Sequence, residues 1–192
     1  AGMPTAAALQ IVDETFLAFA ARPDGPPGVT WGVVADGALA HAGGTGTLRV
    51  GEERRPDATS VFRIASMTKS FTAAAILRLR DAGRLALDDP VGRHVPELAG
   101  LRGPTADAPP PTIRHLLTMS GGLPYDDPLG DRLQAMPLDA FGALLAGGLT
   151  FARAPGTAFE YSNLGYGILG RVVTRAAGRE YRRVVEDELL RP

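Results

Sequence analysis

The sequence predicts an α+β protein in which a short β-hairpin near the N-terminus is followed by a long helical region. Strand-forming residues at Val29–Val34 and Ala38–Gly43 flank Asp36-Gly37, a pair that favours a tight hairpin turn. From Ser66 onward, apolar residues recur at helical spacing. The chain has 192 residues, of which 45% are hydrophobic and 21% charged, and this composition suits one globular domain or two small lobes.

The first predicted element is an amphipathic helix over Thr5–Ala21, ended by the Pro/Gly-rich stretch Arg22–Gly28. The hairpin follows, and the polar stretch Gly51–Thr59 is predicted to be a loop. A two-stranded hairpin is only marginally stable by itself. We therefore expect the hairpin to pack on the N-terminal helix or to be joined by strands from outside this sequence.

The helical region begins with a predicted helix from Ser66 to Ala82, for which Gly83 is placed as a C-terminal cap. An irregular stretch, Leu85–Leu98, contains Asp89-Pro90 as a helix start, and Gly103–Pro111 is predicted to be a surface loop. The remaining predicted helices are one capped by Thr112 and running to Leu117, then Leu138–Ala146, Leu164–Ala177 and Glu180–Leu190, the last two separated by Gly178. This pattern suggests a first region over residues 1–60 and a mostly helical region over residues 61–192.

Composition narrows the possible functions. A net charge of −1 argues against a broad nucleic-acid surface, and no run of about 18 apolar residues predicts a membrane span. The absence of cysteine excludes disulfides and thiol catalysis, and the three histidines lack metal-binding spacing, so we expect no metal and no cofactor. No leader is visible, which leaves both a cytoplasmic and an exported protein open.

The most informative feature is a solitary lysine. The chain has 20 basic residues, of which 19 are arginine, and its one lysine, Lys69, lies three residues after Ser66. Arginine cannot lose its proton near neutral pH, whereas a partly buried lysine can. Residues i and i+3 share one face of a helix, so this amine can reach the serine hydroxyl and help to remove its proton.

The Ser-x-x-Lys pattern has low specificity by itself, because it occurs by chance in roughly one in two chains of this length and composition. The alternative interpretation is a serine that caps a helix and a lysine that lies in solvent. The single lysine among many arginines favours the functional interpretation only modestly.

The residues around the pattern carry a family resemblance in three segments. Phe62–Thr72, which contains Ser66-Met67-Thr68-Lys69, resembles the nucleophile segment of the serine β-lactamase-related family. His115–Pro124 is similar to that family's His-Leu-Leu-Thr-x-x-Ser-Gly-Leu-Pro stretch, with Gly121 where serine is usual, and Pro155–Tyr166 resembles its Tyr-x-Asn element. The family includes class C β-lactamases, D,D-peptidases, some carboxylesterases and D-amino-acid amidases.

The resemblance implies an acyl-enzyme mechanism. Ser66 would attack a carbonyl, Lys69 and Tyr161 would share the proton transfers, and Asn163 would bind the substrate amide or steady Lys69. The other interpretation of Tyr161-Ser162-Asn163 is a helix start, with Asn163 as the cap and Tyr161 packing as a staple.

Other polar residues are expected to be structural. His115 should bond the backbone through its ring, and His41 should be a surface or packing residue. The glycines of Gly43–Gly46 are not followed by Lys-Ser/Thr or by a helix, which argues against a phosphate loop.

The implied fold is β-lactamase/transpeptidase-like, with a helical lobe packed on a five-stranded antiparallel sheet. Three of those strands, and the Lys/His-x-Gly element that one of them carries, are absent from this sequence. We therefore expect a C-terminal portion, as a separate chain, to complete the sheet and to supply one donor of the oxyanion hole.

Two functions follow. The first is a serine hydrolase that acts on a small-molecule or peptide substrate, namely a β-lactam, a D-amino-acid peptide or an ester. The alternative is a non-catalytic fragment or pseudo-enzyme that binds a partner chain or ligand without turnover.

Overall fold

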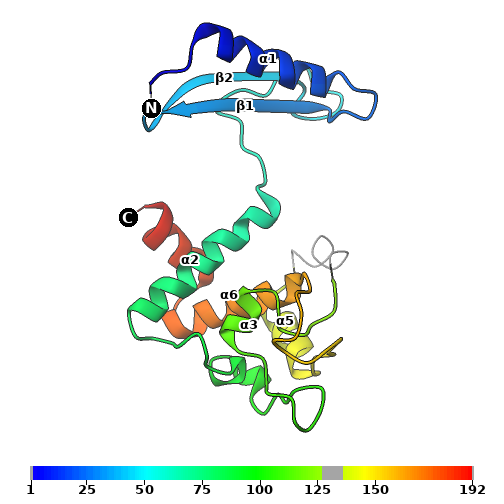
Figure 1. Ribbon diagram of the computed structural model, residues 1–192, viewed down its shortest axis with the longest axis vertical. Helices are drawn as coiled ribbons and strands as arrows, with labels where there is room; N and C mark the ends of the chain where they lie inside the picture. The colour runs from blue at the N-terminus through cyan, green and yellow to red at the C-terminus, as the bar shows by residue number, and fades with distance from the viewer. Residues whose placement is uncertain (1, 127–135, 192) are drawn as a thin grey trace. The chain divides into compact units, whose positions relative to one another are not determined.

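The computed structural model describes residues 2–126 and 136–191, and the chain divides into two compact units, residues 1–63 and 64–192 (Figure 1). In the part of the chain that is described, no helix combines the length and the apolar character needed to cross a bilayer.

The first unit contains the predicted N-terminal helix and hairpin. Helix α1 (Ala6–Ala20) begins where the Thr5 hydroxyl accepts a hydrogen bond from the Ala8 N–H. Strands β1 (Gly28–Ala35) and β2 (Ala38–Gly46) pair antiparallel. Asp36 and Gly37 connect them with φ angles of 48° and 80°, the left-handed conformation of a tight hairpin turn. The hairpin prediction is confirmed, and β2 is three residues longer than expected.

Trp31 anchors α1 to the hairpin. Its ring stacks on Phe16 of α1 with 5.3 Å between the ring centroids, and its indole N–H donates to Asp13. The residue opposite on β2 is Gly43, where a Cβ atom would lie 2.4 Å from the indole ring. This stretch of glycines is therefore strand, and it leaves room for the tryptophan.

The second unit is helical, apart from one isolated bridge between Pro90 and Thr112 in its described residues (Figure 1). Its elements are η1 (Ala65–Met67), α2 (Thr68–Asp81), η2 (Val91–Arg93), η3 (Pro96–Leu98), α3 (Ile113–Leu117), α5 (Leu138–Ala146), α6 (Asn163–Ala177), α7 (Tyr181–Val185) and η4 (Glu186–Leu190).

Two predicted helices need correction. Ser66 does not open the α-helix but lies in the 3-10 turn before it, because the Met67 N–H bonds the Ile64 carbonyl three residues back. The last helix becomes a π-turn after Val185, and the Arg191 N–H bonds the Glu186 carbonyl five residues back.

Helix α6 forms the centre of the second unit. Its residues Ile168, Leu169, Val172 and Val173 are fully buried, and the helix packs against α2, α3 and α7. The buried apolar residues of these facing helices include Ile76 and Leu79 of α2, Ile113 and Leu116 of α3, and Val184 of α7. Burial of this apolar stripe fixes α6 against α2, the helix that directly follows Ser66.

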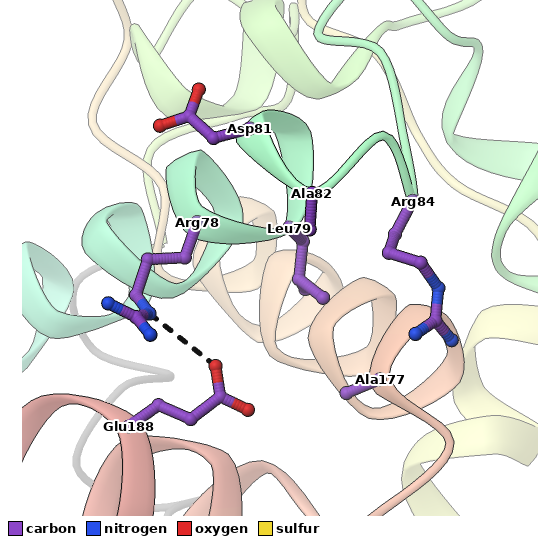
Figure 2. A pocket seen from close by; sticks show the side chains of 7 residues that line it. All are labelled: Arg78, Leu79, Asp81, Ala82, Arg84, Ala177 and Glu188. Atoms are coloured by element: carbon purple, nitrogen blue, oxygen red, sulfur yellow. Dashed lines mark ion pairs between the residues drawn. The ribbon is translucent and has the colours of Figure 1, made fainter. Parts of the chain in front are cut away.

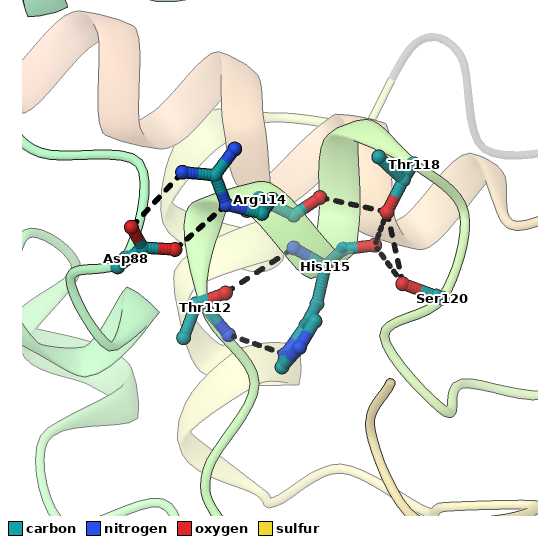
Figure 3. A network of polar contacts seen from close by, with 6 residues as sticks. All are labelled: Asp88, Thr112, Arg114, His115, Thr118 and Ser120. Atoms are coloured by element: carbon teal, nitrogen blue, oxygen red, sulfur yellow. Dashed lines mark hydrogen bonds and ion pairs between the residues drawn. The ribbon is translucent and has the colours of Figure 1, made fainter. Parts of the chain in front are cut away.

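A network of polar contacts holds α3 in place (Figure 3). Thr112 accepts a hydrogen bond from the His115 N–H, and its own N–H donates to the His115 ring at 3.3 Å. This reciprocal cap confirms that His115 bonds the backbone. Arg114 donates twice to Asp88, at 2.7 and 2.9 Å. These contacts fix α3, and α3 in turn fixes the position at which the following segment, residues 118–124, begins.

Candidate active site

The predicted nucleophile lies in the 3-10 turn before α2, next to a strained residue. Ala65 has a φ of 45°, a conformation that is uncommon for a residue with a side chain and that is found often at functional sites. Ser66 follows it and is exposed, whereas Lys69 in the first turn of α2 is half-buried. The Lys69 amine lies 3.2 Å from the Ser66 hydroxyl oxygen.

Lys69 Nζ also contacts two groups from the distant Tyr-x-Asn segment. It lies 2.7 Å from Tyr161 Oη and 2.6 Å from Asn163 Oδ1. With Ser66 Oγ, these atoms bring three oxygens within hydrogen-bond distance of the Lys69 amine. The rings of Tyr161 and Tyr166 lie 4.7 and 5.7 Å from Nζ, within the range of cation–π attraction.

Tyr161 joins the lysine to the serine. Its phenolic oxygen lies 2.6 Å from Ser66 Oγ, and either atom can be the donor. Ser66, Lys69 and Tyr161 thus form a closed triangle of hydrogen bonds, with Asn163 bound to the lysine from outside it. The serine hydroxyl therefore lies at hydrogen-bond distance from the phenolic oxygen, and a phenolate at that position would be able to accept its proton.

The local backbone explains why Tyr161 and Asn163 both face the lysine. Ser162 between them is extended, with φ −138° and ψ 119°, so its neighbours project to the same side. The Ser162 hydroxyl accepts from the Gly165 N–H and is the cap of α6. The alternative in which Asn163 is the cap is therefore wrong, and its side chain is free to hold Lys69.

The second and third resemblance segments are bonded to each other. The Met119 carbonyl accepts from the Glu160 N–H at 2.7 Å, and the Ser120 carbonyl accepts from the Gly156 N–H at 2.8 Å. Met119, whose φ is 56°, also receives the Ser162 N–H on its sulfur at 3.3 Å. The segment after α3 therefore holds residues 156–162, which include Tyr161, in place.

Sequence reasoning missed two residues of this site. Tyr166 lies one turn beyond Asn163 and donates to the Leu117 carbonyl at 3.0 Å. Burial, and secondarily the neighbouring Tyr161, raise the pKa of the Tyr166 phenol above its usual value, which keeps it protonated. Asp126 is buried and bonds the start of α6. The i, i+3 spacing from Asn163 could have revealed Tyr166, but no sequence signal marked Asp126.

A separate cleft lies between the C-terminal ends of α2 and α6 and the turn η4 (Figure 2). Its charged side chains already have partners, since Arg78 pairs with Glu188 at 3.5 Å and Arg84 donates to the Ala176 carbonyl. No group of three or more His, Asp or Glu residues suited to a metal ion occurs within residues 2–126 and 136–191.

Comparison with solved structures defines the class of protein. The chain is similar to the octameric penicillin-binding protein homologue of Pyrococcus abyssi, with a TM-score of 0.79 and 29% identity over 95% of this chain and 42% of that one. It is also similar to a D-stereospecific amidohydrolase from Streptomyces sp., with a TM-score of 0.70 and 28% identity over 98% of this chain and 54% of the other. The fold class is therefore the β-lactamase/transpeptidase fold.

The sequence family agrees with the fold. The β-lactamase family model matches residues 17–192, and the chain belongs to this family of serine hydrolases. It is 32% identical over 163 residues to the D-alanyl-D-alanine-carboxypeptidase/endopeptidase AmpH of Escherichia coli (strain K12), a match that covers 83% of this chain and 42% of AmpH. The chain thus spans less than half of the length of that relative.

Proposed function

We propose that the chain carries the reactive residues of a serine hydrolase that works through an acyl-enzyme. The observation that carries this proposal is the position of Lys69 Nζ, which lies within 3.2 Å of Ser66 Oγ, Tyr161 Oη and Asn163 Oδ1 together. A serine hydroxyl is a poor nucleophile unless a base lies beside it, and this arrangement supplies one.

In the proposed reaction, Ser66 Oγ forms a bond to the substrate carbonyl carbon and its proton passes to the Tyr161 phenolate. The Lys69 ammonium favours that phenolate by its charge and its hydrogen bond. When the tetrahedral intermediate collapses, the bond to the leaving amine or alcohol breaks and Tyr161 returns the proton to it. Water then cleaves the acyl-enzyme, with Tyr161 acting in the reverse direction.

The proposed substrate is an amide or peptide with a D-amino acid, because two of the similar proteins are a D-alanyl-D-alanine-carboxypeptidase/endopeptidase and a D-stereospecific amidohydrolase. β-Lactams and esters are the other candidates for the same chemistry. Asn163 holds Lys69 through Oδ1, and its amide nitrogen can donate to the substrate carbonyl group.

We also propose that a further polypeptide segment completes the site. The hairpin of the first unit has two strands, and Val34 and Leu39 on it are exposed. Further strands would cover such apolar surface. The proposed reaction also needs a second oxyanion donor besides the Ser66 N–H, which we expect the further segment to supply. One missing donor of this kind costs on the order of 100-fold in rate.

The alternative function is binding without turnover. Under this alternative, the site would hold a ligand or partner chain without forming a covalent adduct.

A turnover panel tests the proposal. Nitrocefin, a p-nitrophenyl ester and a peptide ending in D-alanyl-D-alanine are assayed with the chain alone and with any longer native polypeptide that contains it. We expect turnover of the D-peptide that disappears in Ser66→Ala. Turnover that survives this substitution would contradict the assignment of the nucleophile, and binding of all three compounds without turnover would favour the alternative.

A further inference from the structure

We propose that Asp126 is a positioning residue for the reaction, holding Tyr161 and Asn163 against Lys69 through the backbone of α6. This inference rests on the proposed function for its effect on rate. Its structural part, the effect on Lys69, can be tested without any turnover.

The carboxylate of Asp126 is buried, with 4% of the residue exposed, and it binds the first residues of α6. Oδ1 accepts from the Asn163 N–H at 2.6 Å, and Oδ2 accepts from the Leu164 N–H at 2.6 Å and from the Ser162 hydroxyl at 3.2 Å. The amides at the start of a helix have no partner within the helix. Asp126 satisfies two of them from a segment that is 37 residues away from Asn163.

Asp126 does more than an ordinary cap, because Ser162 already fills that role for the Gly165 N–H. The residue that Asp126 holds by the backbone, Asn163, is the one whose side chain binds Lys69. The carboxylate and the ammonium therefore hold the same residue from opposite ends. A displacement of Asp126 would move Asn163 Oδ1 directly.

Tyr125, the residue before Asp126, contacts the other end of the same element. The ring of Tyr125 lies 6.3 Å from the ring of Tyr161, centroid to centroid, at a tilt of 51°. Tyr125 and Asp126 thus contact both ends of the Tyr161-Ser162-Asn163 element. A shift of 1 Å in reacting groups can lower a rate by about 100-fold, so this support matters for catalysis.

Charge gives a second reason for a carboxylate at this position. The Asp126 carboxylate is buried, and a buried carboxylate is costly unless it is compensated. The positive end of the α6 dipole provides that compensation. A neutral side chain could accept some of the same bonds at lower cost, but it would leave the start of α6 less firmly held.

Asp126→Asn tests the inference with a side chain of nearly the same shape. Its amide group can accept at one atom, but its NH2 then faces an N–H or hydroxyl donor that needs an acceptor. We expect kcat to fall about tenfold or more while KM changes little, since the loss concerns the placement of proton-transfer groups.

The readout that does not depend on turnover is the NMR signal of Lys69. As the chain has a single lysine, incorporation of 13C-labelled lysine gives one Cε resonance that reports on this site alone. We expect Asp126→Asn to displace this resonance at pH 7. If Asp126→Asn does not fold, Ser162→Ala, which removes one of the three bonds to the carboxylate together with the cap bond from the Gly165 N–H, should displace the resonance in the same direction.

Asp89→Asn is the matched control. Asp89 is another buried carboxylate of the second unit, and it bonds the Ala86 N–H, Arg93 and His94 without touching the four site residues. This variant should lower the melting temperature and leave the Lys69 resonance and kcat unchanged.

The outcomes separate the two proposals. If Asp126→Asn leaves the Lys69 resonance in place, or if Asp89→Asn displaces it equally, the positioning role is wrong. If the resonance moves in Asp126→Asn alone while the unsubstituted protein turns over no substrate, the positioning role holds and the proposed hydrolase function fails.

Discussion

At the scale of single residues, Lys69 occupies a place that arginine could not fill. Its amine lies 2.6 to 3.2 Å from three oxygens, those of Ser66, Tyr161 and Asn163. A guanidinium group is planar and larger, so it cannot bring one nitrogen within reach of all three oxygens. The one lysine of a chain with 19 arginines therefore lies at the position where a compact cation must contact three oxygens.

Lys69→Arg is expected to lower the reactivity of Ser66 by about 1,000-fold or more, since the compact charge that favours the Tyr161 phenolate and the geometry of the site are both lost. The rate of Ser66 acylation by a fluorescent penicillin measures this effect. Arg78→Lys, a change of cation on the same helix in the ion pair with Glu188, should leave the rate within about twofold. Equal losses in both variants would contradict a specific role for Lys69.

Tyr161→Phe removes the phenolic oxygen that bridges Ser66 and Lys69 and keeps the ring. General acid–base groups contribute about 100- to 10,000-fold, and a loss of kcat in that range is expected. Tyr166→Phe is the matched control, because it removes a phenol that donates to the Leu117 carbonyl instead of one that touches Ser66. A larger loss of kcat in Tyr166→Phe than in Tyr161→Phe would reverse the assignment.

At the scale of elements, an ion-pair cluster connects η3 to α6. Glu97 of η3 pairs with Arg171 and, at 3.3 Å, with Arg175, both on α6. The hydrogen bond from Arg171 is the largest cause that holds the pKa of the Glu97 carboxyl below its usual value of 4.5. A group whose pKa is lower in the folded state stabilises the fold above its unfolded pKa and loses that effect as the pH falls.

The second unit should therefore lose stability as the pH falls below about 4.5 and through the lower pKa of folded Glu97. Glu97→Gln should reduce this loss of stability at acid pH, and it should lower the free energy of unfolding at pH 7 by about 3 kcal/mol, because it leaves Arg171 with a weaker partner. Thermal melting from pH 7 to pH 3 measures both effects. Glu186→Gln, which disturbs a surface pair with Arg183, should leave the loss of stability at acid pH unchanged.

The sequence predicted elements well where the signal is local. Leu138–Ala146 is observed as predicted, and the Asp36-Gly37 turn and the Gly178 stop both follow from a conformation that glycine adopts easily. The start of α2 was mispredicted, because the left-handed Ala65 and the 3-10 turn after it have no compositional signal. The role of Asp126 depends on a contact across 37 residues, which periodicity cannot reveal.

Contacts between residues far apart in the sequence also limited the prediction of the site. The serine and lysine could be paired from their spacing, because one helical turn joins them. Tyr161 and Asn163 lie more than 90 residues away from Lys69 and were placed in the site by resemblance. Only the fold shows that both reach one amine.

At the scale of the whole molecule, the two units differ in how much apolar surface they bury. The main cluster of buried hydrophobic residues belongs to the second unit, whereas Trp31 is the one buried hydrophobic residue among those described in the first. Helix α1 buries no residue fully. Stability follows buried apolar area, so the second unit should be the more stable one.

Hydrogen exchange tests this difference. The amides of α6 should exchange most slowly, and those of the β1–β2 pairing should exchange at least about 100-fold faster in the chain alone. Mass spectrometry of peptic peptides resolves the two regions. Equal protection of the hairpin and α6 would show that the first unit is already stable without further strands.

The central claim is that Ser66 is a nucleophile activated by Lys69 and Tyr161, and a covalent adduct tests it most directly. The protein is incubated with a fluorescent penicillin and with a fluorophosphonate, and the modified peptide is identified by mass spectrometry. We predict one adduct per chain, located on Ser66 and lost in Ser66→Ala and Lys69→Arg. An adduct on another residue, or equal labelling of the Lys69→Arg variant, would contradict the claim.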